Sequence, residues 1–95
     1  MERAAIPFST KYQRDSAVRR RRSAGDIFLI KATDVVSVDS FSDAVFALCD
    51  GTMDVLTIIK MMVSRYREQE PVSVAAHTLY NLEYFSARGL IRHRQ

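Results

Sequence analysis

Turn-forming residues divide this chain into short segments, and their spacing is the feature that most constrains the fold. Gly51 closes one short apolar segment with helical spacing and opens a second, which ends in a polar run before Pro71. Gly89 closes a third. Glycine and proline end helices because glycine adopts the left-handed conformation at little cost and proline lacks an N–H donor. The sequence therefore predicts three short helices in its carboxyl-terminal part.

Three short segments precede these helices, at 17–22, 26–32 and 35–39. The first begins with Ala and Val, and the other two are rich in β-branched and apolar residues. Gly25 fits a tight turn between the first two, because it tolerates a positive φ angle. The middle segment contains four consecutive apolar residues, 27–30, which cannot all lie on one face of a strand. We therefore expect an antiparallel meander whose middle segment is a central strand covered on both faces.

Each expected helix has an N-cap candidate and an apolar stripe. Ser40 or Ser42 would cap the first helix, Thr52 the second and Ser73 the third. The stripe of the second helix repeats at i, i+3 and i+4, and it consists of Val55, Ile58, Ile59, Met62, Val63 and Tyr66. The inward stripe of the third helix is Ala75, Leu79, Leu82, Phe85 and Ser86. Its outer flank carries His77, Tyr80, Asn81, Tyr84 and Arg88.

The predicted fold class is α+β, with a three-stranded antiparallel sheet followed by three helices in the order of a winged helix-turn-helix module. The 95 residues are 47% hydrophobic and 26% charged, as in ordinary globular domains. Residues 1–15 show no sustained period and contain Pro7, so we expect a flexible arm before a domain at 16–95. No apolar stretch reaches the roughly 18 residues that cross a bilayer. The opening residues lack the apolar core of a signal peptide and the chain has one cysteine, which favours a cytoplasmic protein.

A Leu-Cys-Asp-Gly turn at 48–51 is followed by an Ile-Ile pair at 58–59 and an Arg-Tyr pair at 65–66. Together with the order of the segments, this spacing resembles the PqqD family of small peptide chaperones. The resemblance covers residues 15–92 and is strongest over these three motifs. It implies a non-catalytic module that binds the leader segment of a ribosomally synthesised precursor peptide. It also implies that the module presents this peptide to a modifying enzyme, such as a radical SAM or cyclising enzyme.

In that family the leader docks as an extra strand on the third strand of the sheet and packs into a groove formed with the last helix. Such docking is physically reasonable because an edge strand offers unpaired N–H and C=O groups, and alternate side chains give specificity. The resemblance places the peptide contacts on one strand and one helix. The expected contact residues are Val35, Val36 and Val38 on the strand, with His77, Tyr80, Asn81 and Tyr84 on the helix.

The basic residues leave other interpretations open. Half of the 14 lie in the first 22 positions, including the run at 19–22. Such a run usually keeps a surface solvated, but it also suits an acidic partner, so a DNA-binding winged-helix regulator is the main alternative. The last helix disfavours nucleic acid, since its Asn81 and Arg88 are set against Glu83. It also carries Tyr80 and Tyr84 and contains no lysine. A third interpretation is an adaptor that forms a homodimer through its edge strand.

Neither catalysis nor metal binding finds support in the sequence. Cys49 is the one nucleophile of note, and no histidine or carboxylate stands at a spacing that would activate it. Its apolar neighbours suit a small buried residue. A metal site would require Cys49, His77 and His93 to converge, and these lack the close pairing of zinc ligands. We therefore expect no enzyme activity, no metal and no cofactor.

Overall fold

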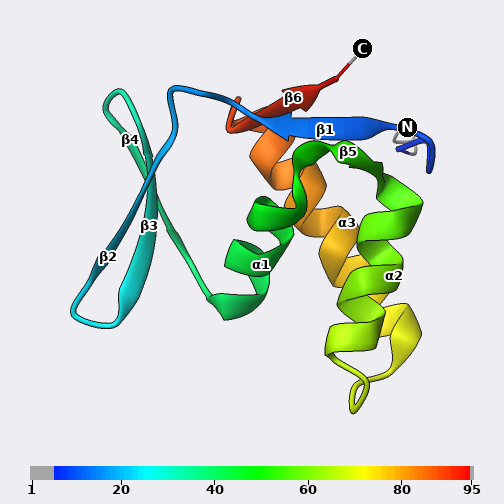
Figure 1. The fold of residues 1–95 in the computed structure, drawn as a ribbon. Coiled ribbons are helices and arrows are strands. Elements are labelled where there is room, and N and C mark those ends of the chain that lie inside the picture. The colour runs from blue at the N-terminus through cyan, green and yellow to red at the C-terminus, as the bar shows by residue number, and fades with distance from the viewer. Residues whose placement is uncertain (1–5, 95) are drawn as a thin grey trace, which may run out of the picture.

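The computed structural model describes residues 6–94, which form two three-stranded antiparallel sheets and three helices. The α+β class is confirmed, although the sequence predicts only one sheet. In chain order the elements are β1 (Lys11–Arg14), β2 (Arg19–Ser23), β3 (Asp26–Lys31), β4 (Asp34–Val38), α1 (Ser40–Leu48), β5 (Asp50–Asp54), α2 (Val55–Arg65), α3 (Pro71–Ala87) and β6 (Ile91–His93). Figure 1 shows β2, β3 and β4 to one side of the helices, with the other sheet above the helices.

The sheet formed by β2, β3 and β4, which we call the wing, is the predicted meander. Its central strand is β3, as the sequence predicts. Its first turn has two residues, Ala24 and Gly25, whose φ angles of 51° and 87° are both positive. Two positive φ angles are typical of a type I′ turn, whose twist matches that of the flanking strands. The predicted tight turn at Gly25 is therefore confirmed.

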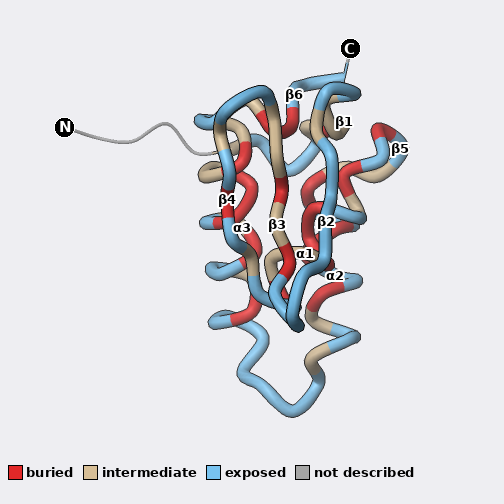
Figure 2. Tube along the Cα trace, turned by 90° about the vertical axis from the view of Figure 1, so that its left-hand side faces the viewer, coloured by how far each residue is buried: buried red, intermediate tan, exposed pale blue. Residues whose placement is uncertain are grey.

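The wing has one buried face and one open face. Leu29 and Val36 are buried and belong to the core cluster shared with the helices. Phe28 and Ile30 alternate with Leu29, so they lie on the opposite face, where they are only half-buried. Figure 2 shows the wing in front of the helices, with no described element over its outer face. The prediction that both faces of β3 are covered is therefore wrong.

The second sheet has the order β5-β1-β6 and is absent from the sequence-based prediction. Strand β1 falls within residues 1–15, which the sequence assigns to an arm, yet it pairs with β5 on one side and β6 on the other. Its Tyr12 is only 3% exposed. Strand β1 is thus part of the folded domain, while residues 1–5 lie outside the described residues. These strands are short and mostly polar, so they show no clear alternation of apolar residues.

Aspartates cap the first two helices in place of the predicted serine and threonine residues. The Asp39 carboxylate accepts a hydrogen bond from the Ser42 backbone N–H at 2.8 Å and begins α1. Asp54 accepts one from the Thr57 backbone N–H at 2.8 Å and begins α2. A carboxylate suits this position because it satisfies a free N–H group and faces the positive end of the helix dipole. The predicted cap Thr52 lies in β5 instead.

Helix α3 begins at Pro71, before the predicted cap Ser73. Proline is well suited to the first helical position, because an N–H there would have no partner within the helix. The predicted inward stripe is only partly right. The residues of α3 that are buried in the structure are Val74, Thr78, Asn81, Leu82 and Phe85. Asn81, expected on the outer flank, is therefore inside, and Ala75 and Leu79 are only half-buried.

The core joins the helices to both sheets, and the predicted stripe of α2 lies in it. Val55, Ile58, Ile59 and Met62 are buried, while Leu56 on the same helix is 38% exposed. Replacing one buried aliphatic side chain removes its transfer free energy and leaves a cavity.

We expect Ile58→Ala to lower the free energy of unfolding by about 2–5 kcal/mol, because Ile58 is fully buried. Urea denaturation measures this change. Leu56→Ala is the control on the exposed side of the same helix, and it should cost less than about 1 kcal/mol. Equal losses for the two variants would contradict the assignment of Ile58 to the core.

Candidate functional site

A groove of about 240 Å³ runs between the wing and α3. Figure 2 shows β4 on the side of the wing that lies in front of α3. The groove draws on β4, on the first turn of α1 and on the middle of α3. Its lining residues are Ser37, Val38, Ser42, Tyr80, Asn81, Tyr84 and Phe85.

The floor of the groove contains a polar side chain that is only 4% exposed, Asn81. Its side-chain nitrogen donates to the backbone carbonyl of His77, one turn earlier, at 2.9 Å. Its amide oxygen has no hydrogen bond within residues 6–94. Since the described residues contain no fully buried side-chain N or O atom without a partner, this oxygen is still open to solvent. An amide oxygen that water can still reach at the bottom of a groove can accept a hydrogen bond from a ligand N–H. Asn81 therefore places an acceptor group next to the aromatic residues Tyr80, Tyr84 and Phe85 in the groove lining.

Two tyrosines form the outer wall of the groove on α3. The rings of Tyr80 and Tyr84, one helical turn apart, are stacked with centroids 6.3 Å apart. Tyr80 is 61% exposed. Exposed tyrosines combine a large apolar ring with a polar tip, which is why they are common in binding sites. This wall offers apolar contact area that no described element covers.

An ion pair crosses one end of the groove. Arg88, which follows α3, donates to the carboxylate of Asp34 at the start of β4, at 2.7 Å. Its guanidinium group also lies 5.3 Å from the centre of the Tyr84 ring. The pair is partly exposed, so it contributes little to stability, but it links the end of α3 to the first residue of the edge strand.

An aromatic cluster closes the other end. His77 stacks on Phe41 of α1 with ring centroids 4.2 Å apart, and Phe41 also contacts Tyr66. His77 therefore borders the groove and is not among its lining residues. The hydrogen bond from the Ser42 backbone lowers the pKa of Asp39, and the nearby His77 lowers it further. The aspartate that caps α1 thus stays ionised while it holds this end of the groove in place.

The strand beside the groove is an edge strand, because β4 pairs only with β3 in the described chain. Lys31 and Asp34 flank its two-residue turn and are paired. In such a hairpin the flanking pair is hydrogen-bonded, and hydrogen-bonded and non-hydrogen-bonded pairs then alternate. Val36 therefore directs its N–H and C=O toward β3, whereas Val35 and Ser37 direct theirs outward. Strand β4 thus presents two residues with free backbone groups.

The opposite edge of the wing is poorly suited to strand addition. Strand β2 consists largely of arginines, and charged side chains protect an edge from pairing. Arg20 donates two hydrogen bonds to the carboxylate of Asp43 on α1, at 2.7 and 2.8 Å. A second hollow of about 490 Å³ lies here, and both residues line it. Arg20 and Asp43 are occupied with each other, and Arg14, which also lines the hollow, donates to the backbone carbonyls of Phe46 and Ala47. This hollow therefore offers fewer free polar groups to a peptide than the groove at β4.

The structure brings most of the predicted contact residues together. Val38, Tyr80, Asn81 and Tyr84 line the groove. Val35 is 56% exposed on β4, whereas Val36 is 5% exposed and points into the core. Ser37, Ser42 and Phe85 are lining residues that the sequence did not single out. The sequence holds one indication that Ser37 belongs to the site, which is its place as a polar residue between Val36 and Val38 in the predicted last strand.

The described residues contain no group suited to catalysis by a thiolate or to metal binding. Cys49 is fully buried, and loss of solvent raises the pKa of its thiol to about 12. Its sulfur donates to the carbonyl of Val45. Within residues 6–94, no three His, Cys, Asp or Glu side chains gather closely enough to hold a metal ion. None of the helices in this range combines the length and the apolar character needed to span a bilayer.

Comparison with known proteins gives one informative similarity. No family model and no curated protein matches the chain. Among solved structures, the fold is similar to that of "TbiB1 in Complex with the TbiA(beta) Leader Peptide", with a TM-score of 0.69 over 87% of this chain and 98% of that chain. The two sequences are 12% identical, so the likeness concerns the fold alone. The chain therefore shares its fold with a protein whose structure contains a leader peptide.

Proposed function

We propose that this chain binds an extended peptide as a fourth strand on β4, with alternate peptide side chains in the groove beside α3. The observation that carries the proposal is the meeting of a strand edge and an aromatic wall on one groove. Ser37 lies on one side of this groove, and Tyr80 and Tyr84 lie on the other. Strand addition supplies main-chain hydrogen bonds, and the groove supplies side-chain selectivity.

The backbone of β4 provides part of the binding free energy. Val35 and Ser37 each offer one N–H and one C=O, which allows about four hydrogen bonds to an added strand. At about 0.5–1.5 kcal/mol each, these contribute about 2–6 kcal/mol. A micromolar complex requires about 8 kcal/mol. Burial of apolar peptide side chains against Tyr80 and Tyr84 must supply the remainder.

We further propose that the peptide is the leader segment of a ribosomally synthesised precursor and that the chain presents it to a modifying enzyme. Two independent features support this class of ligand. One is the resemblance of the segment at 48–66 to the PqqD family. The other is the shared fold with a protein solved in complex with a leader peptide. The enzyme would be one that acts on peptides, such as a radical SAM or cyclising enzyme.

The structure disfavours one alternative, the DNA-binding regulator, and makes the other, the homodimer, a competitor of the peptide. A DNA reader needs polar or basic side chains on its recognition helix, but the groove face of α3 carries Tyr80 and Tyr84, and Asn81 is buried. A homodimer through β4 would use the same outward groups of Val35 and Ser37 as the peptide. Self-association would therefore compete with peptide binding.

Calorimetric titration distinguishes a peptide ligand from nucleic acid. We expect micromolar or tighter affinity for a synthetic leader taken from a short reading frame beside the gene. A random DNA duplex of about 20 base pairs, titrated at about 0.15 M salt, should bind more weakly. Equal affinity for the duplex, with a steep dependence on salt, would support the regulator and overturn the proposal.

Two substitutions test the two sides of the groove. Ser37→Pro removes an outward N–H from an edge strand, where proline is tolerated, so it should abolish peptide binding and leave the fold intact. Val36→Pro is the contrasting variant, because it removes a bond to β3 and should destabilise the wing itself. Circular dichroism and calorimetry separate these effects.

On the helix side, Tyr80→Ala should weaken peptide binding about tenfold or more, because the ring is an exposed part of the wall. Val72→Ala, at the exposed start of α3 and outside the groove lining, is the control and should leave affinity unchanged. Undiminished affinity in both Ser37→Pro and Tyr80→Ala would place the ligand elsewhere.

A further inference from the structure

The outer face of the wing is a second surface, distinct from the groove. The pairing of β2, β3 and β4 arranges its side chains in two rows across the strands. The register places Arg19, Ile30 and Val35 in one row, and Arg21, Phe28 and Ser37 in the other. Since side chains alternate between faces, both rows point away from the core residue Leu29.

The middle of this face is apolar and has no partner in the described structure. Phe28 and Ile30 are half-buried but do not join the core cluster, and Val35 is 56% exposed. An aromatic and two branched aliphatic side chains therefore adjoin one another across two strands. On an antiparallel sheet with one solvated face, polar residues are expected at such positions. An apolar group here indicates an interaction surface.

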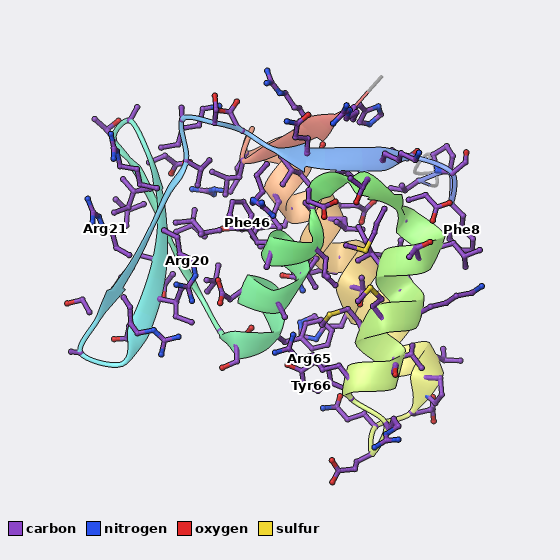
Figure 3. The ribbon with its side chains drawn as sticks, viewed as in Figure 1. Phe8, Arg20, Arg21, Phe46, Arg65 and Tyr66 are labelled. Carbon is purple, nitrogen blue, oxygen red and sulfur yellow. The ribbon has the colours of Figure 1, made fainter. Side chains whose placement is uncertain are left out.

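The border of this face along β2 is positively charged. Figure 3 shows Arg21 on the side of the wing away from the helices, whereas Arg20 lies between the wing and α1. Arg20 is paired with Asp43. Arg19 and Arg21 have no ion-pair partner within residues 6–94. Their charges are thus available to an external partner, as expected for arginines at the rim of a protein interface.

We propose that the outer wing face, defined as Arg19, Arg21, Phe28, Ile30 and Val35, docks a protein whose complementary patch is apolar and bordered by Asp or Glu. A second copy of this chain is a poor occupant, because the residues of its outer wing face include arginines and no Asp or Glu, so two such faces lack complementary charge. Nucleic acid is also a poor occupant. Its phosphates would satisfy two arginines but would leave Phe28 and Ile30 without apolar contacts.

The proposal does not rest on peptide binding in the groove, and its test can be kept separate from it. The probe is a phage-displayed library of random peptides of about 12 residues, selected on the full chain. We expect enrichment of sequences that combine Asp or Glu with aliphatic or aromatic residues. Their affinity should fall about tenfold in Arg19→Glu/Arg21→Glu, the equivalent of two lost charge pairs.

The matched control is Arg65→Glu/Arg67→Glu, which changes the net charge equally on exposed positions at the end of α2 and beyond it. This control and Tyr80→Ala should bind the selected peptides like the parent protein. Ile30→Thr should weaken them, because it reduces the apolar centre while keeping a β-branched residue.

Three results would overturn the proposal. The first is equal loss of affinity in both charge-reversed proteins. The second is loss in Tyr80→Ala, which would place the selected peptides in the groove. The third is tighter, Arg19- and Arg21-dependent binding of a random DNA duplex than of the selected peptides at about 0.15 M salt.

Discussion

The groove depends on how the wing is held beside the helices. Leu29 and Val36 anchor the wing through buried apolar contacts, which carry most of its stability. Lys31 at the end of β3 then fixes its position, because its Nζ donates to the carbonyl of Gly89 at 2.8 Å and pairs with Asp15 at 3.3 Å. Ion pairs that stay partly open to water contribute little free energy, so the role of this contact and of Arg88 with Asp34 is positional. Together they keep β4 beside α3 without closing the space between them.

Much of this arrangement could be predicted from the sequence. The meander, the Gly25 turn, the order of the helices and the stripe of α2 follow from local periodicity and turn residues, and the structure confirms them. The sheet of β1, β5 and β6 could not be predicted, because it depends on pairing between segments far apart in the chain. Tyr12 is buried by that pairing and by the core, and no local pattern reveals it.

The candidate site was predictable at the level of its elements and less so at the level of single residues. The predicted strand and helix do lie beside each other, since Val38, Tyr80 and Tyr84 line one groove, while their contact with a peptide stays a prediction. Helical periodicity placed Asn81 outside, but a polar side chain can be buried once its amide nitrogen bonds to the preceding turn. Val36 and Val35 look alike in the sequence, and only the register of the hairpin shows which one faces outward.

The wing therefore has an edge and a face with different chemistry. Its edge at β4 offers backbone groups beside tyrosines, and its outer face offers apolar side chains beside the arginines of β2. A strand added to β4 would widen that face by one strand, so a partner docked there would lie close to the bound peptide.

Amide hydrogen exchange along β4 tests the central claim most directly. In the free protein the account predicts rapid exchange at Val35 and Ser37, whose N–H groups point outward, and slow exchange at Val36 and Val38, which bond to β3. A saturating leader peptide should slow exchange at Val35 and Ser37 and leave the other two unchanged. Unchanged exchange at Val35 and Ser37 with the peptide bound would contradict strand addition on β4.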